Sequence, residues 1–199
     1  MSVEDWMPAA LRAAASDRKL KAGEALFRRG GKPLGLYQVI AGSVRLVRVD
    51  RAGHEIVLHV AALGETLAEA SLFSTQYRCD AIASTDATVR LYPKQQLLAA
   101  FEESPKAMKA FTGMLAHLVM DLRTRLEQRN IRSARERVRH FLALNAGIDG
   151  RTIECRGTLK DLAAELGLTH EALYRTLAAL EGSGEIKRKG KAITLLNRV

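Results

Sequence analysis

Four side chains near residue 170 have types and spacing suited to reading DNA bases: His170, Glu171, Tyr174 and Arg175. An arginine can donate two hydrogen bonds to guanine O6 and N7, and a glutamate can accept one from cytosine N4. On a helix these residues would share one face, because neighbours at i+3 and i+4 lie side by side. The alternative without DNA binding is an ordinary helical hairpin on which Glu171 and Arg175 form a surface ion pair.

The segment from Thr158 to Leu180 predicts the helix-turn-helix that would position them. Thr158 is a good N-cap, and Gly167 suits a sharp turn with positive φ. Thr169 would then cap the second helix, whose first residues are those that meet base edges in a recognition helix. The predicted buried residues are Leu159, Leu162, Ala163 and Leu166 in the first helix, and Ala172, Leu173, Thr176, Leu177 and Leu180 in the second.

The next residues, Glu185 to Leu196, read as a β-hairpin with Gly190 at its tip. Basic side chains around that tip would suit contacts to DNA phosphates. A helix-turn-helix followed by a basic wing favours DNA binding over a plain hairpin. The predicted DNA contacts are Thr169, His170, Glu171, Tyr174, Arg175, Lys187, Arg188, Lys189 and Lys191.

The composition is consistent with a polyanionic partner. The 199-residue chain carries a formal net charge of +9, which suggests nucleic acid or a membrane surface. No apolar run approaches the roughly 20 residues needed to cross a bilayer, and Glu4 and Asp5 argue against a signal peptide. Cys79 and Cys155 are too few for a disulfide framework, so a reducing, cytoplasmic location is expected. Because no long apolar run is present, we also expect no membrane partner.

Short apolar alternations separated by glycine extend from about Lys19 to Pro93. They predict an antiparallel β-roll. The expected strands are Leu36–Ala41, Ser43–Val49, Glu55–Val60, Cys79–Ala83 and Thr88–Tyr92, followed by a short helix at Lys94–Phe101.

A long helix is expected from about Pro105 to nearly Asn130. Its apolar residues alternate in steps of three and four, the spacing of a coiled-coil seam. We expect a homodimer interface there, whereas the alternative is an amphipathic helix lying on its own domain. The residues assigned to the interface are Phe111, Leu115, Leu118, Val119, Leu122 and Leu126.

The predicted fold class is therefore α+β, with a third helix at Ala134–Ala146 and a short strand near Thr152–Cys155 completing the C-terminal part. Three regions are expected: a β-roll sensor domain over 1–104, a dimerisation helix over 105–131 and a winged helix-turn-helix over 132–199.

In this arrangement, and in the segments Gly42–Leu46, Gly64–Glu65 before Leu72–Phe73, and Thr169–Arg175, the chain resembles the Crp/Fnr family of bacterial transcription regulators. The resemblance covers almost everything from Leu20 onward. It implies a dimer that binds a pseudo-palindromic promoter site and has RNA polymerase as a further partner. It also implies that Glu171 and Arg175 read each half-site, while Tyr174 stands where some members have a smaller residue.

The resemblance also suggests effector-binding residues: Glu65, Arg78, Cys79, Leu122 and Arg123. In cyclic-nucleotide binders an acid holds the ribose and an Arg-Ser pair holds the phosphate, but here Cys79 replaces the serine. Leu122 and Arg123 stand where hydroxyl residues contact adenine. Leaving the adenine amino group without such partners costs roughly 1–3 kcal/mol, so cyclic AMP is disfavoured.

Other sensors and functions fit less well. An iron–sulfur cluster needs about four cysteines and the chain has two. Haem remains open, with His54, His59, His117 and Cys79 as candidate ligands, and Cys79 could instead sense oxidation. No metal-ligand spacing is present, and no nucleophile–base or phosphate-loop motif, so we expect no enzyme activity. The remaining alternative is a ligand-binding module whose winged helix contacts proteins rather than DNA.

Overall fold

A computed structural model of the chain describes residues 7–155, 158–190 and 192–196. The chain divides into an N-terminal unit, Met1–Val119, and a C-terminal unit, Met120–Val199. The division falls inside the long helix α3 (Pro105–Asn130), whose bounds match the expected ones.

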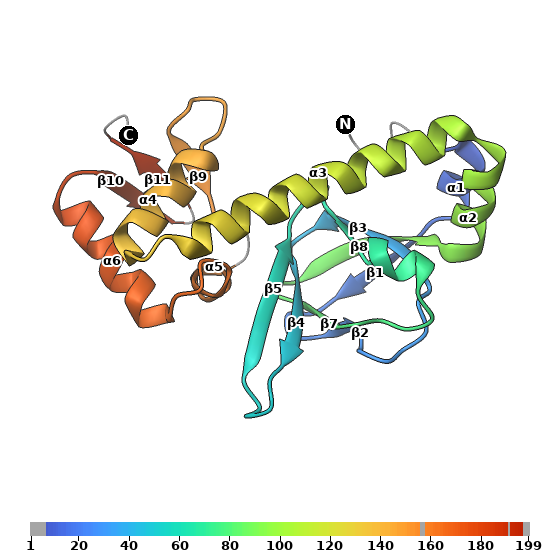
Figure 1. Cartoon of the computed structure of the whole chain (residues 1–199), viewed down its shortest axis with the longest axis horizontal. Helices are drawn as coiled ribbons and strands as arrows, with labels where there is room; N and C mark the ends of the chain where they lie inside the picture. The colour runs from blue at the N-terminus through green and yellow to red at the C-terminus, as the bar shows by residue number, and fades with distance from the viewer. Residues whose placement is uncertain (1–6, 156–157, 191, 197–199) are drawn as a thin grey trace. The chain divides into compact units, whose positions relative to one another are not determined.

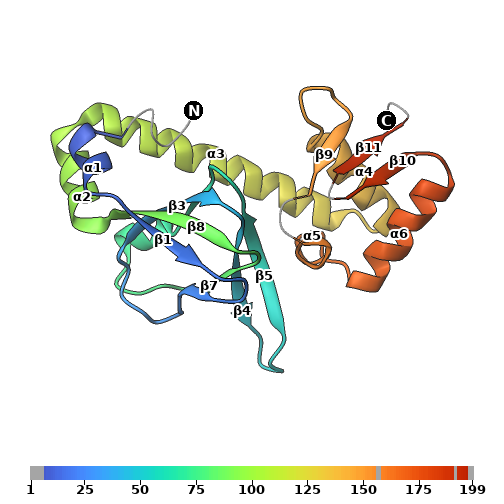
Figure 2. The same cartoon turned by 180° about the vertical axis from the view of Figure 1, so that it is seen from behind.

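The N-terminal unit contains two four-stranded antiparallel sheets, seen from opposite sides in Figures 1 and 2. The predicted β-roll is confirmed, and the ends of all five expected strands lie within one residue of those observed. One sheet has the order β1 (Ser16–Leu20), β8 (Ala87–Pro93), β3 (Gly35–Ala41), β6 (Thr66–Leu67); the other has the order β2 (Ala25–Phe27), β7 (Asp80–Ala83), β4 (Val44–Val49), β5 (Glu55–Ala61).

The core of the roll is apolar and partly aromatic. Val39, Val44 and Val89 are completely buried in it, as the alternation of their strands requires. The ring of Phe27 stacks on that of Tyr77 with centroids 3.8 Å apart. Burial raises the pKa of the Tyr37 hydroxyl, which lies 3.4 Å from the Tyr77 hydroxyl. The aromatic group therefore packs as part of the core and stays uncharged.

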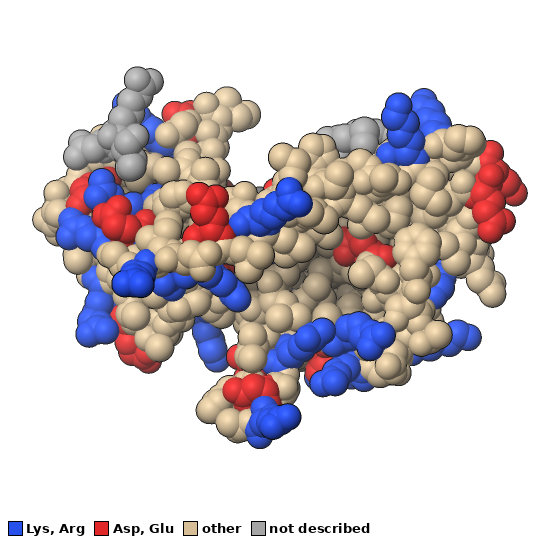
Figure 3. Space-filling view, in the orientation of Figure 1, with Lys and Arg blue, Asp and Glu red and all other residues tan. Residues whose placement is uncertain are grey.

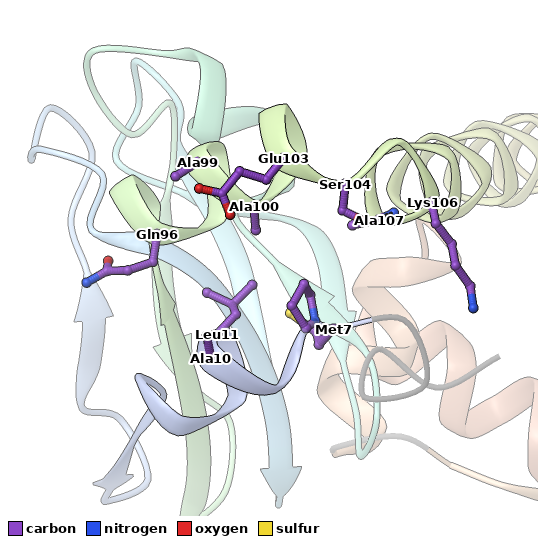
Figure 4. A pocket seen from close by; sticks show the side chains of 11 residues that line it. Met7, Ala10, Leu11, Gln96, Ala99, Ala100, Glu103, Ser104, Lys106 and Ala107 are labelled. Atoms are coloured by element: carbon purple, nitrogen blue, oxygen red, sulfur yellow. Dashed lines mark hydrogen bonds between the residues drawn. The ribbon is translucent and has the colours of Figure 1, made fainter.

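A second core lies between the roll and its helices, α1 (Ala9–Ala13), α2 (Lys94–Glu103) and the first part of α3. Phe111 of α3 belongs to this core: it is 1% exposed, and its ring centroid lies 4.8 Å from that of Phe101. Phe111 was expected in a dimer seam, but its side chain is covered by its own unit. A pocket of about 600 Å³ lies beside this core, where Met7 and Leu11 face Ala100 and Ala107 (Figure 4).

The C-terminal unit packs three helices against a small antiparallel sheet. Its elements are α4 (Ala134–Leu144), β9 (Thr152–Glu154), α5 (Leu159–Glu165), α6 (His170–Gly182), β10 (Ile186–Lys189) and β11 (Ala192–Leu195), with sheet order β10-β11-β9. Its core is formed by Val138, Phe141, Leu142, Ile153, Leu162, Ala163, Leu166, Leu173, Leu177, Leu180, Ile186, Ile193 and Leu195. The predicted helix-turn-helix with a small sheet as its wing is confirmed.

No helix in the described parts of the chain is both long enough and apolar enough to cross a membrane.

Gly35 allows β3 and β8 to approach closely. A Cβ atom at Gly35 would lie 1.9 Å from the carbonyl oxygen of Tyr92. We expect Gly35→Ala to lower the free energy of unfolding by about 1–3 kcal/mol or more, as overpacking does elsewhere. Urea unfolding followed by far-UV circular dichroism measures this. Gly113→Ala is the control, because a Cβ there meets nothing within 4 Å; equal stability of the two variants would contradict the packing described.

Candidate nucleic-acid interface and ligand pocket

Helix α5 begins with a reciprocal cap. The Thr158 hydroxyl oxygen accepts a hydrogen bond from the Asp161 N–H (3.1 Å), and the Asp161 carboxylate accepts one from the Thr158 N–H (2.9 Å). This capping box satisfies two backbone donors that a helix start leaves without partners. The helix ends at a turn where Gly167 has φ +64°, a conformation that favours glycine. The turn chemistry predicted from the sequence is thus present.

Helix α6 is held with one face inward. The Thr169 hydroxyl caps it by accepting from the Ala172 N–H at 3.1 Å. Leu173, Leu177 and Leu180 are completely buried at spacings of four and three. The structure brings the four predicted base-reading side chains together on the exposed side of the same helix: His170, Glu171, Tyr174 and Arg175.

The chemistry of this exposed face is well defined. Hydrogen bonds from its own backbone N–H and from Thr169 lower the pKa of Glu171, so it presents an ionised carboxylate acceptor. The His170 ring contacts Tyr174 edge-on, with ring centroids 4.9 Å apart. Within the described residues no ion pair of 4 Å or less joins Glu171 to Arg175. Both charged groups are therefore exposed to a ligand.

The wing follows directly. Strands β10 and β11 pair in register from Ile186–Leu195 to Lys189–Ala192, and Gly190 at the tip has φ +61°. Lys187 and Lys189 are exposed on β10. Figure 3 shows lysine and arginine side chains over this unit with acidic side chains between them. The predicted contact Lys191 lies outside the described residues.

Arg188 differs from its neighbours in the wing. Its guanidinium lies 2.7 Å from Glu181 of α6, and its backbone N–H donates to the same carboxylate at 3.0 Å. These contacts lower the pKa of Glu181. The Arg188 charge is therefore already paired within the protein, and its observed contact ties the wing to α6.

At the other end of the chain, Glu65 closes a tight turn. Its carboxylate accepts from the Ala62 N–H at 3.1 Å and lies 3.6 Å from His59 Nε2. Gly64 beside it has φ +84°. These contacts give Glu65 a structural role in the loop before β6.

Arg78 lines a pocket of about 450 Å³ in the N-terminal unit, together with Arg29, Gly30, Arg48, Gln76 and Tyr77. Arg48 Nε donates to the Arg78 carbonyl oxygen at 3.2 Å. The adjacent Cys79 is half-buried, and burial raises the pKa of its thiol. A raised pKa lowers the fraction of reactive thiolate, which argues against Cys79 as an oxidation sensor.

Sequence reasoning did not single out Glu69, yet it is the buried carboxyl of this region. It is 9% exposed, and it follows Ala68, a residue with φ +70°. The Thr66 hydroxyl donates to it and lies 3.8 Å from the Met114 sulfur of α3. Burial raises the pKa of Glu69. The available signal was an acid between two apolar residues, Leu67 and Leu72.

Leu122 and Arg123, the other predicted effector residues, are exposed on α3. No group of three or more His, Cys, Asp or Glu side chains within the described ranges could hold a metal ion. His54, one of the haem candidates, is exposed and lies 3.2 Å from Asp50.

Comparison with known families matches both units. Residues 17–104 match the cyclic nucleotide-binding domain, and residues 136–199 match the Crp-like helix-turn-helix domain. The chain belongs to the Crp/Fnr family. As a member it is a DNA-binding transcription regulator with a sensor domain of the cyclic nucleotide-binding type, and it is not an enzyme.

Individual Crp/Fnr relatives agree over most of the chain. The transcriptional activator protein anr of Pseudomonas aeruginosa is 22% identical over 92% of this chain and 77% of its own length. The nitrogen fixation regulation protein FixK of Bradyrhizobium diazoefficiens is 27% identical over 88% and 76%. The structure of FixK2 from Bradyrhizobium japonicum has a TM-score of 0.79 at 23% identity, covering 92% of this chain and 93% of that one. This structural likeness supports the fold.

The buried carboxyl of Glu69 predicts a pH-dependent stability of the regulator. Its pKa is raised in the folded state, so its contribution to stability is fully present below the unfolded-state pKa and is lost as pH rises through the folded-state pKa. Glu69→Gln is neutral throughout. We therefore expect the variant to have the larger free energy of unfolding at pH 7, and the difference to vanish below about pH 4.

Urea unfolding of both proteins between pH 4 and pH 8 measures this difference. Glu102→Gln, at an exposed acid of α2, is the control and should follow wild type across the range. A Glu69→Gln protein that is less stable than wild type at pH 7 would show that the carboxylate is stabilising where it lies.

Proposed function

We propose that this regulator binds a pseudo-palindromic promoter site as a homodimer, with α6 in the major groove of each half-site. The observation that carries the proposal is the exposed face of α6, where Glu171 and Arg175 are presented on a helix held by three buried leucines. Half-sites of a dimeric helix-turn-helix protein lie about one helical turn apart. Such a protein works where the chromosome and RNA polymerase are, so we place it in the cytoplasm with the polymerase as a partner.

Each residue of the interface has a distinct proposed part. Arg175 donates to a guanine and the Glu171 carboxylate accepts from a cytosine. His170 and Tyr174 contact each other, so they act together in tuning the preferred sequence. Thr169, at the N-cap, lies next to the positive end of α6, where phosphate binds well. Lys187, Lys189 and Lys191 bind phosphates without reading bases.

The proposed dimer forms along α3, the connecting helix expected over 105–131. Leu115, Val119, Leu122 and Leu126 follow one another at spacings of four, three and four, as in a coiled coil. Leu115 and Leu118 are half-buried, whereas Val119, Leu122 and Leu126 are 47%, 46% and 64% exposed. Exposed apolar side chains in a row on one helix are what a partner helix would cover.

We propose an effector other than cyclic AMP for the sensor domain. Cys79 offers a half-buried thiol of raised pKa in place of a serine hydroxyl. Leu122 and Arg123 offer no hydroxyl acceptor to an adenine amino group. Three arginines line the Arg78 pocket. The buried acid in the segment before Arg78 is Glu69 and not Glu65, the acid that the resemblance assigns to the ribose. These features favour a ligand whose polar groups differ from those of cyclic AMP.

Base readout and phosphate contact predict different behaviour on mutation. Arg175→Ala removes a bidentate donor, so specific binding should weaken by about 1–3 kcal/mol and selectivity at one base position should relax. Lys189→Ala should weaken binding to all sequences alike and reduce the salt slope by about 1. Gel-shift titrations on a set of single-base operator variants at several salt concentrations separate the two. Unchanged affinity and preference in Arg175→Ala would refute the recognition-helix assignment.

If the dimer forms along α3, disrupting that interface should reduce the molecular mass in solution to that of the monomer. Leu122→Asp combined with Leu126→Asp places two carboxylates in the proposed interface, where they would lose water without partners. We expect a monomer by sedimentation equilibrium at concentrations where wild type is a dimer, and a loss of operator binding. The control is Leu34→Asp, at a leucine of similar exposure (57%) in the N-terminal unit. A double variant that remains dimeric would place the interface elsewhere.

A further inference from the structure

The guanidinium of Arg137 donates hydrogen bonds to three backbone carbonyl oxygens, and neither base reading nor phosphate contact explains them. It lies in the first turns of α4, after the N-cap Ser133. Its Nε and Nη2 donate to the Ile131 carbonyl at 2.9 and 2.6 Å. Its Nη1 donates to the Leu166 carbonyl at 2.9 Å and to the Gly167 carbonyl at 3.2 Å. All of these atoms belong to the C-terminal unit.

The three carbonyls come from two separate segments. Leu166 is the C-cap of α5, and Gly167 forms the turn of the helix-turn-helix. Carbonyls at the end of a helix have no intrahelical donor and lie at the negative end of the helix dipole, so a cation there is favourable. Ile131 directly follows the end of α3 at Asn130. One guanidinium therefore joins the segment after α3 to the turn that precedes α6.

Only arginine can make this set of contacts. Its planar group carries five N–H donors in a fixed fork, whereas lysine has a single ammonium that cannot reach separated acceptors together. The group also packs at the turn itself, since a Cβ at Gly167 would lie 3.6 Å from Arg137 Nη1. A second contact joins α3 itself to the last residue of α5, because Arg125 lies 3.7 Å from Glu165.

The position of this tie matters for α6. His170, the first residue of α6, is three positions after Gly167, and the base-reading side chains follow at once. A shift of the turn would therefore move the start of α6, where Glu171 and Arg175 lie. Phosphate contacts made by the flexible lysines of the wing tolerate such a shift, whereas base contacts with fixed geometry do not.

We propose that Arg137 is a positioning residue for sequence recognition: it holds the helix-turn-helix turn in the orientation at which α6 reads bases. This inference rests on the proposed function of α6. It makes Arg137 act through Glu171 and Arg175, without touching DNA.

The test compares specific with non-specific binding. Arg137→Lys keeps the charge and loses the fork. Its affinity should be measured by fluorescence anisotropy for the operator that wild type enriches from random DNA, and for a scrambled duplex of equal length. We expect specific affinity to fall by about tenfold or more, as on misalignment of one base contact of α6, while scrambled-DNA affinity and its salt slope stay as in wild type.

Matched variants separate positioning from folding. Arg139→Lys, two residues along α4 and paired with Glu136 and Glu185, should leave the ratio of the two affinities unchanged. If circular dichroism shows that Arg137→Lys unfolds below the temperature of the binding assay, Gly167→Ala replaces it. That variant perturbs the same turn by placing a Cβ on a residue with φ +64°, a conformation that disfavours one. It should show the same selective loss.

Each outcome is decisive. Equal losses on operator and scrambled DNA in both variants would reduce Arg137 to a folding role, and an unchanged ratio would remove the role altogether. A wild-type protein that does not distinguish operator from scrambled DNA would overturn the proposed function, and this inference with it.

Discussion

The burial of Leu173, Leu177 and Leu180 is the interaction on which the reading surface depends. Each leucine buried in a core contributes about 1.5–3 kcal/mol, so rotating α6 to expose this row would remove much of the stability of a small unit. The rotation of α6 is therefore fixed, and with it the outward presentation of Glu171 and Arg175. Thr169 at one end of α6 and the Glu181–Arg188 pair near the other add local ties.

Local patterns predicted the elements that carry this surface. The apolar spacing of α3 and α6, the caps Thr158 and Thr169, and the glycine at position 167 each act within a few residues, so they are readable from the sequence. The strands of the roll were equally accessible, because period-two alternation and glycine turns delimit them. For the same reason the four exposed residues at the start of α6 were correctly grouped on one face.

What escaped prediction depends on packing between distant segments. Phe111 shares the apolar stripe of α3 with the residues of the proposed seam, but α2 and the roll cover it first. Glu69 is buried by the fold of its loop, where its partner Thr66 lies 3.8 Å from the sulfur of Met114, a residue 48 positions further along the chain than Thr66. From the sequence, Arg188 was predicted to contact DNA like the other basic residues of the wing. Its partner Glu181 lies on the other side of the turn from α6 to β10, so the pair was not recognised. In each case the local pattern was compatible with two environments, and only the tertiary structure distinguishes them.

In the proposed complex, two copies of α6 read a two-fold symmetric site. Selection from a random DNA pool with the purified protein, followed by sequencing, measures whether the preferred site has this symmetry. We expect enrichment of an inverted repeat whose half-sites lie about one helical turn apart. Enrichment of a single asymmetric half-site, or of no sequence at all, would contradict it.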